Sequence, residues 1–173
     1  MNTLHLLRHA KSSRKEDVED HARTLSRRGR ETARRVGKHL PAKLGTIDLV
    51  LCSSARRTRE TLDLVLLDFS PAPRTMIEDE LYLASREKLA ARLRRLDPRE
   101  GSVLLIGHNP GLYELAVALA DENSPDFRAF ASGKFPTAAW ASFLISPDWS
   151  ALGDSRHELT GYVTPASLPG EKG

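Results

Sequence analysis

The sequence predicts a three-layer α/β/α sandwich built around a mainly parallel mixed sheet. Short apolar runs alternate with amphipathic segments of helical periodicity, which is the pattern of an α/β protein. The run over residues 102–107 is apolar almost throughout, as expected for a strand that is buried on both faces. No repeat, low-complexity tract or linker divides the 173 residues. We therefore expect one domain over residues 1–166, followed by a flexible C-terminal tail over residues 167–173.

The individual elements follow from periodicity and from residues that start or stop helices. The expected strands are residues 4–7, 47–52, 75–77, 102–107, 137–145 and, at an edge, 157–163. The expected helices are residues 26–40, 55–69, 85–96 and 110–120. Ser26 and Ser85 are expected N-caps, Pro41 is expected to end the first long helix, and Asn109 is expected to cap the last one with Pro110 as its first residue. Residues 121–135 are expected to form a long polar loop.

Composition excludes several classes of protein. The chain has a single cysteine, Cys52, which excludes an internal disulfide framework and a CxxC metal or redox motif. Its start has no basic segment followed by an apolar one, and no apolar run approaches the roughly 20 residues that span a bilayer. We therefore expect a cytoplasmic protein with no membrane partner. The net charge of +3 and the pI near 9.2 are compatible with an anionic partner or with an ordinary solvated surface.

Polar or basic residues directly follow three of the predicted strands. Arg8-His9 follow the first strand, Ser53-Ser54 follow the second, and His108-Asn109 follow the strand over residues 102–107. In open α/β sheets, ligands bind beyond the carboxyl ends of the strands. The sequence therefore predicts one site at this edge of the sheet.

The residue types at these strand ends suit a phosphate. A histidine such as His9 can attack an electrophile or hold a proton, and neighbouring guanidinium groups favour its neutral, nucleophilic form. His108 precedes a helix N-terminus, where free N–H groups bind anions. Arg56 and Arg57 begin another helix, where the helix dipole disfavours cations unless an anion offsets them. The alternatives are a strand-end histidine bonded to backbone, a turn histidine without a ligand, and a solvated arginine-rich helix start.

Together these segments resemble the histidine phosphatase superfamily, the group that includes the phosphoglycerate mutases. Leu7-Arg8-His9-Ala10 matches the R-H-G motif of that family, with Ala10 in place of glycine. Ser53-x-x-x-Arg57-x-x-x-Thr61 matches its S-P-x-x-R-A-x-x-T motif, with Ser54 for proline and Thr58 for alanine. Gly107-His108 matches its second histidine. The resemblance spans roughly residues 1–145 and implies a phosphoglycerate mutase-like fold.

The chain is more narrowly similar to the SixA branch, which comprises small phosphohistidine phosphatases without a large lid insertion. The matching segments are Arg8-His9-Ala10-Lys11-Ser12, Asp20-x-x-Arg23-x-Leu25-Ser26-x-x-Gly29 and Gly107-His108-Asn109-Pro110. The chain lacks the length and the acid pattern of the mutase branch.

The resemblance implies a role for each matching residue. His9 would be the nucleophile that becomes phosphohistidine, and water would then hydrolyse that intermediate. Arg8, Arg57 and His108 would surround the phosphoryl group and stabilise its equatorial oxygens. Asn109 would contribute to substrate binding beside them. No metal or other cofactor is implied, because the arginines and the second histidine supply the positive charge.

The general acid is the weakest part of the pattern. Acid phosphatases of the superfamily have aspartate directly after the second histidine, where this chain has Asn109. Glu80 and Asp20 are the candidate general acids, and each is also compatible with a purely structural role. A phosphohistidine substrate has a labile P–N bond and needs little help from an acid. The absence of a clear acid therefore favours such a substrate.

The predicted function is a metal-independent phosphatase that acts on phosphohistidine in a protein. A small phosphomonoester is the alternative substrate, and a non-catalytic phosphate- or phosphoprotein-binding module is the alternative from another class. Nucleic acid is not an expected partner, and the sequence does not indicate an oligomeric state. Other residues are expected to be structural: His5 and Cys52 in the core, and His39 and His157 on the surface. The stripe of Arg27, Arg28, Arg30, Arg34 and Arg35 is either a solvated helix face or a surface for an acidic protein.

Overall fold

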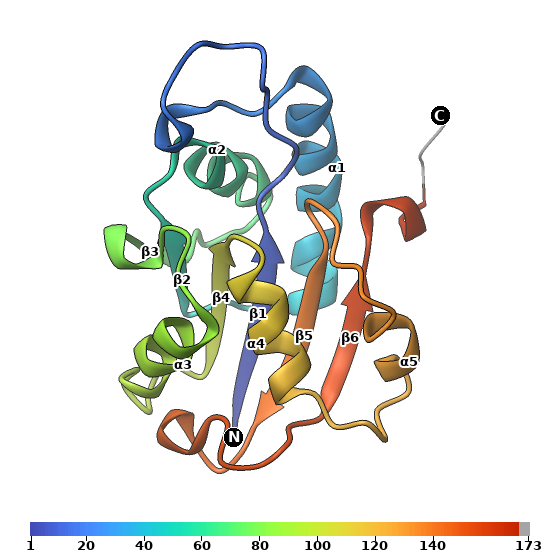
Figure 1. Ribbon diagram of the computed structural model, residues 1–173. Coiled ribbons are helices and arrows are strands. Elements are labelled where there is room, and N and C mark those ends of the chain that lie inside the picture. Colours follow the sequence, from blue (N-terminus) through green and yellow to red (C-terminus); the bar gives the residue numbers. More distant parts are fainter. Residues whose placement is uncertain (170–173) are drawn as a thin grey trace.

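The computed structural model describes residues 1–169 and has one six-stranded sheet with helices on both faces (Figure 1). The strands are β1 (Asn2–Arg8), β2 (Leu49–Ser53), β3 (Arg74–Glu78), β4 (Ser102–Gly107), β5 (Trp140–Ile145) and β6 (Leu159–Val163). Their order in the sheet is β3-β2-β4-β1-β5-β6, in which β3, β2, β4 and β1 are parallel and β5 and β6 are antiparallel to their neighbours. The predicted fold class is therefore confirmed.

The helices are α1 (Arg27–Leu44), α2 (Arg56–Val65), α3 (Arg86–Arg94), α4 (Gly111–Leu119) and the short α5 (Phe127–Phe130). The helices α1 and α2 cover one face of the sheet, and α3 and α4 cover the other. Side chains alternate between the two faces along each strand. In β4, Val103 and Leu105 pack toward α3 and α4, whereas Leu104 and Ile106 pack toward α1 and α2. This explains why the central strand is apolar at every interior position.

The helix starts agree with the sequence better than the helix ends. The hydroxyls of Ser26 and Ser85 accept hydrogen bonds from backbone N–H groups in the first turns of α1 and α3, as expected of N-caps. The prediction that Pro41 ends the first helix is wrong, because α1 continues to Leu44 and closes at Gly45, where φ is +67°. Proline keeps a helical φ and removes only one hydrogen bond, so the last turn forms around it.

The start of α4 also differs from the prediction. The helix begins at Gly111 with Pro110 in the N-cap position, one residue later than predicted. The Asn109 side chain still caps the first turn, because its Oδ1 accepts a hydrogen bond from the Tyr113 N–H at 3.3 Å. Its amide nitrogen donates to the carbonyl of Phe135 at 3.0 Å. Asn109 therefore joins the start of α4 to the long loop.

Several other element boundaries differ from the predicted ones by a few residues. The helix α2 stops at Val65, four residues before the predicted end. The strand β5 starts at Trp140 rather than at residue 137, and the predicted loop over residues 121–135 contains α5. The position of β6 at a sheet edge is confirmed.

The C-terminal part of the chain packs further than expected. Leu168 is buried in the core beneath α1, although the predicted tail begins at residue 167. Residues 170–173 of that tail lie outside the described residues.

The buried polar groups complete the fold. Cys52 is buried in the core, as predicted. His157 is buried rather than on the surface, because its Nε2 accepts a hydrogen bond from the Gly153 N–H at 3.1 Å. Within residues 1–169, no helix has both the length and the hydropathy that crossing a bilayer requires.

Candidate active site

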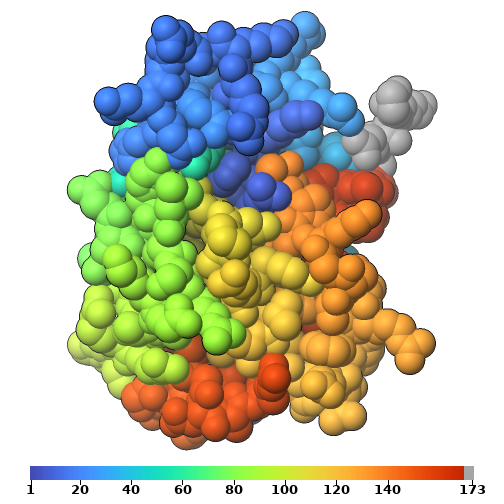
Figure 2. Space-filling view, in the orientation of Figure 1, coloured from blue at the N-terminus to red at the C-terminus, as the bar shows by residue number. Residues whose placement is uncertain are grey.

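A cavity of about 290 Å³ lies beyond the carboxyl ends of β1 and β4. Five of the predicted site residues line it: Arg8, His9, Arg57, His108 and Asn109. The other lining residues are Lys11, Ser12, Arg14, Arg23, Leu83 and Thr137. This edge of the sheet lies toward the top of Figure 1, and in Figure 2 the blue N-terminal part of the chain meets the green, yellow and orange segments there.

His9 is held in one orientation by the backbone of the next residue. Its Nδ1 lies 2.7 Å from the carbonyl oxygen of Ala10, which can only accept, so Nδ1 carries the proton. The Ala10 N–H in turn donates to the hydroxyl of Thr61 at 3.0 Å. Burial of the ring lowers the pKa of His9 to about 4, and the charges of Arg57 and Arg8 add to that lowering. At neutral pH, His9 is therefore neutral with an unprotonated Nε2.

Arg57 joins the two histidines. It lies in the first turn of α2, and only 4% of its surface is exposed. Its Nε lies 3.4 Å from His9 Nε2, and one of its terminal nitrogens lies 3.3 Å from His108 Nδ1. The same guanidinium donates to the backbone oxygen of Asp20 at 2.8 Å and to its carboxylate at 3.1 Å. Asp20 therefore fixes the one cation that faces both imidazoles.

His108 is buried opposite His9, and the centroids of the two rings are 5.3 Å apart. Its Nε2 lies 2.7 Å from the hydroxyl of Ser53, which also accepts a hydrogen bond from the Ala55 N–H at 3.3 Å. Burial lowers the pKa of His108 to about 3, and nearby His9 and Arg57 contribute further. Arginine can only donate, so His108 Nδ1 accepts from Arg57, and Nε2 carries the proton of the neutral ring and donates it to the Ser53 hydroxyl.

Arg8 and Asn109 share one anchor. Each donates a hydrogen bond from its side chain to the carbonyl of Phe135, at 3.2 Å from Arg8 and at 3.0 Å from Asn109. The Oδ1 of Asn109 accepts from the Tyr113 N–H at 3.3 Å. Arg8 Nε is buried and has no hydrogen-bond partner among residues 1–169. A buried donor of this kind is costly unless a ligand accepts from it.

The charges around the cavity are of one sign. Its ionisable lining residues outside the two histidines are the cations Arg8, Lys11, Arg14, Arg23 and Arg57. No carboxylate lines it, and within residues 1–169 no three His, Cys, Asp or Glu side chains converge as metal ligands would. Arginine donates in a planar fork that matches the oxygens of a phosphate. The arrangement therefore suits a phosphoryl group.

The two candidate acids occupy different environments. The Asp20 carboxylate accepts hydrogen bonds from the Tyr82 hydroxyl, from Arg23 at 2.9 Å and from Arg57 at 3.1 Å. These bonds, with that of Tyr82 first, hold the pKa of Asp20 well below its usual range. Glu80 is about half exposed, pairs with Arg95 at 3.1 Å and does not line the cavity. Asp20 thus contacts the site as an ion, and Glu80 is outside it.

Sequence reasoning missed Tyr82. Its ring centroid lies 5.5 Å from that of His108, and its hydroxyl binds the Asp20 carboxylate. Gly111 permits this approach, because a Cβ there would lie 1.9 Å from the Ala84 carbonyl oxygen. The start of α4 therefore packs directly on the segment that carries Tyr82. The available signal was the acidic stretch Glu78-Asp79-Glu80-Leu81, which directly precedes Tyr82.

Comparison with known sequences identifies the family. The model of the histidine phosphatase superfamily (branch 1) matches residues 4–82, which carry His9 and Arg57. An uncharacterized protein of Mycobacterium tuberculosis is 33% identical over 161 residues, which cover 92% of this chain and 99% of that protein. The chain belongs to the histidine phosphatase superfamily. An uncharacterized protein of Mycobacterium leprae is 30% identical to this histidine phosphatase over 164 residues, with 92% and 99% of the two chains covered.

Solved structures agree with this assignment. A candidate phosphohistidine phosphatase SixA from Nakamurella multipartitia superposes with a TM-score of 0.83 at 27% identity, covering 96% of this chain and 97% of that one. The corresponding candidate SixA from Agrobacterium tumefaciens has a TM-score of 0.77 at 25% identity, with 95% and 98% covered. A protein histidine phosphatase SixA complexed with tungstate shares the fold, with a TM-score of 0.75 at 23% identity and with 95% and 97% covered. The predicted phosphoglycerate mutase-like fold is thereby confirmed.

Proposed function

We propose that this histidine phosphatase hydrolyses phosphorylated substrates through a phosphohistidine formed on Nε2 of His9. The observation that carries the proposal is the hydrogen bond from His9 Nδ1 to the Ala10 carbonyl. It leaves the lone pair on Nε2, next to Arg57 and facing His108. An uncharged imidazole with a fixed tautomer is what a nucleophilic histidine requires.

In the first step, the Nε2 lone pair of His9 attacks phosphorus. A P–N bond forms, the bond to the leaving group breaks, and its electron pair departs with the leaving group. Negative charge on the equatorial oxygens is stabilised by the guanidiniums of Arg8 and Arg57, and by His108 in its protonated form. In this role, Arg8 Nε would gain the acceptor that it lacks among residues 1–169.

In the second step, water attacks the phosphohistidine. The P–N bond breaks and its electron pair returns to Nε2, which restores neutral His9 and releases inorganic phosphate. The same three cationic or proton-bearing groups stabilise this transition state, since charge develops on the same oxygens. Positive charge from arginine serves both steps, so we expect activity in the presence of EDTA.

We further propose that the favoured substrate is phosphohistidine on a protein. Asp20, the carboxylate that contacts the machinery, is bonded to two guanidiniums and a phenol, so it is ionised and not a proton donor at neutral pH. A substrate with a labile P–N bond departs without strong general-acid help. The two SixA proteins that this chain resembles at 27% and 25% identity are candidate phosphohistidine phosphatases, which supports the same substrate class.

The test is phosphate release in EDTA from a phosphohistidine-bearing protein and from p-nitrophenyl phosphate, with wild type beside His9→Ala. We expect release from the phosphohistidine protein by the wild type and a loss of at least about a thousandfold in the variant. Release from p-nitrophenyl phosphate alone would assign a small phosphomonoester as the substrate class. Release from neither, with both ligands bound, would make the protein a phosphate-binding module.

A second experiment tests the role of Asp20. If Asp20 positions Arg57, Asp20→Asn lowers kcat/KM by about tenfold for good and poor leaving groups alike, because the lost interaction acts on the phosphoryl group. If Asp20 is the general acid, the loss grows as the leaving group becomes more basic. Glu80→Gln is the matched control, and we expect it to leave kcat/KM unchanged.

A further inference from the structure

A second cavity, of about 570 Å³, adjoins the candidate active site. Lys11 and Thr137 line both cavities, so the two are neighbours. Its walls come from the first half of α1, from the loop before β5 and from the segment after β6. In Figure 2 the blue, orange and red parts of the chain that carry these walls adjoin at the upper right. We call this cavity the basic groove, after its four cations Lys11, Arg28, Arg35 and Lys134.

The charges of the basic groove are unbalanced. Among residues 1–169, its ionisable lining groups are the four cations and Tyr162, and no Asp or Glu lines it. Lys11, Arg28 and Lys134 are exposed, whereas Arg35 donates to the Pro165 carbonyl at 3.0 Å and helps to shape the wall. The cations of the candidate active site line the adjoining cavity. The positive charge therefore extends well beyond what one phosphoryl group needs.

The rest of the lining suits a polypeptide. Tyr162, Pro136 and Pro165 offer apolar surface, and threonine and serine residues line the groove together with the cations. The cations come from three segments, namely the loop after β1, α1 and the loop before β5, whereas Arg57 contacts both His9 and His108 and lines the smaller cavity with Arg8. A second phosphate would favour convergence, and several carboxylates on an extended chain would favour spacing.

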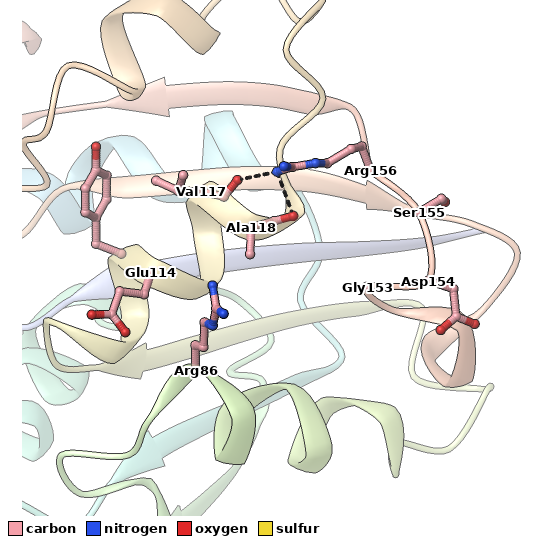
Figure 3. A pocket seen from close by; sticks show the side chains of 9 residues that line it. Arg86, Glu114, Val117, Ala118, Gly153, Asp154, Ser155 and Arg156 are labelled. Carbon is pink, nitrogen blue, oxygen red and sulfur yellow. Dashed lines mark hydrogen bonds between the residues drawn. The ribbon is translucent and has the colours of Figure 1, made fainter.

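A hollow on another part of the surface provides the contrast. It is lined by Arg86 and Arg156, but also by Glu114 and Asp154 (Figure 3). Arg156 donates to the carbonyls of Val117 and Ala118 near the end of α4, at 2.8 and 2.9 Å. In this hollow two carboxylates accompany the two arginines, and Arg156 is already hydrogen-bonded to backbone carbonyls. An excess of positive charge is therefore not a property of every hollow on this protein.

We propose that the basic groove binds an acidic polypeptide segment that flanks the phosphorylated side chain of a protein substrate. This proposal rests on the proposed function, because it supplies the specificity of the same site. Carboxylates of the segment pair with Lys11, Arg28 and Lys134 while the phosphoryl group lies against His9. Since exposed ion pairs contribute little individually, the effect comes from several of them acting together.

The kinetic test uses two phosphohistidine peptides that differ only in flanking glutamates or glutamines. We expect the wild type to prefer the glutamate peptide in kcat/KM, and we expect Arg28→Glu combined with Lys134→Glu to lower that preference by about tenfold. Lys38→Glu combined with Lys43→Glu is the matched control, because it changes the net charge equally on α1 outside the groove. Equal kcat/KM for the two peptides, or an equal effect of the control, would overturn the proposal.

A binding test separates this proposal from the proposed function. The probe is the unphosphorylated glutamate peptide, labelled with fluorescein and measured by anisotropy at low salt, where exposed charges are least screened. We expect it to bind more tightly than the glutamine peptide, and the Arg28→Glu, Lys134→Glu variant to remove the difference. If the glutamate peptide binds more tightly but the enzyme releases no phosphate, the proposed function is wrong and the proposal for the basic groove is supported. If phosphate is released but the two peptides bind equally, the groove proposal fails. Tighter binding of an oligonucleotide of equal charge would also overturn it.

Discussion

The hollow beside α4 and the candidate active site differ most in what their charged groups are already bound to. The hollow beside α4 has a volume of about 600 Å³, twice that of the candidate active site at about 290 Å³. In the larger one, Arg156 is engaged by two carbonyls and carboxylates line the same walls. In the smaller one, Arg8 retains a buried donor without a partner in the described part of the chain, and no carboxylate lines the walls. The candidate active site is therefore distinguished from the hollow beside α4 by its hydrogen-bond donors and not by its volume.

The largest expected effect tests that distinction at two arginines. Arg57→Ala should lower kcat/KM by about a thousandfold, because it removes a cation that faces both His9 and His108. Arg86→Ala, in the hollow beside α4, should leave kcat/KM unchanged. Steady-state kinetics on a phosphohistidine protein checks both, with circular dichroism to confirm folding. Since Arg57 is buried, Arg57→Lys is a second variant that keeps most of the volume, and its expected loss is about a hundredfold.

The next effect concerns how the buried His9 makes the free energy of unfolding depend on pH. The pKa of His9 is lowered to about 4, whereas a histidine in the unfolded chain titrates near 6.5. As the pH falls, the unfolded state therefore binds a proton before the folded state does. The free energy of unfolding is unaffected by His9 above about pH 6.5 and decreases as the pH falls below that value. We expect His9→Asn to lose about 2 kcal/mol less than the wild type between pH 7 and pH 5. Urea unfolding at the two pH values measures this, and an equal loss in both proteins would contradict it.

A smaller effect is expected from the hydroxyl that supports His108. Ser53→Ala should lower kcat/KM by about tenfold, because the Nε2–H of His108 loses the acceptor that orients the ring. The ¹⁵N chemical shifts of the His108 ring should change together with the rate. The matched control is Ser54→Ala, whose hydroxyl contacts His21 instead. A similar rate loss in both variants would indicate a general disturbance of the turn after β2.

The smallest effect should appear only in stability. Arg156→Ala should lower the free energy of unfolding by about 1 kcal/mol, because carbonyls near the end of α4 lose a charged donor. Phosphatase activity should be unchanged, since the hollow beside α4 has no role in the proposed reaction. Chemical denaturation and steady-state kinetics on the same preparation check this. A clear loss of phosphatase activity in folded Arg156→Ala would mean that the hollow beside α4 is coupled to the candidate active site.

The parts of the fold that could be predicted are those set by local rules. The apolar strands, the serine caps of α1 and α3, and the polar residues after β1, β2 and β4 all depend on short stretches of sequence. The errors arose where a distant segment decides. The N-cap position of α4 falls on Pro110 rather than on Asn109, whose amide also binds Phe135, and the backbone of residues 119–121 with Gly153 buries His157.

The candidate site shows the same division. The strand-end rule selected Arg8, His9, Arg57 and His108, since each follows a buried strand or starts the next helix. It could not separate Asp20 from Glu80, because only the packing of the segment before α1 brings Asp20 to Arg57. Tyr82 was missed for a related reason, since its approach depends on contact between Gly111 and Ala84.

The hydrogen bond from His9 to the Ala10 carbonyl has a consequence for how the motif can vary. In catalytic triads, a carboxylate on a separate element orients the histidine, so nucleophile geometry depends on two distant side chains. Here a peptide oxygen one residue away does this, and every amino acid carries that oxygen. Position 10 is therefore free to change as far as orientation is concerned, and only its lack of room limits it, because Ala10 is completely buried. An alanine in place of the family's glycine is a substitution that this geometry permits.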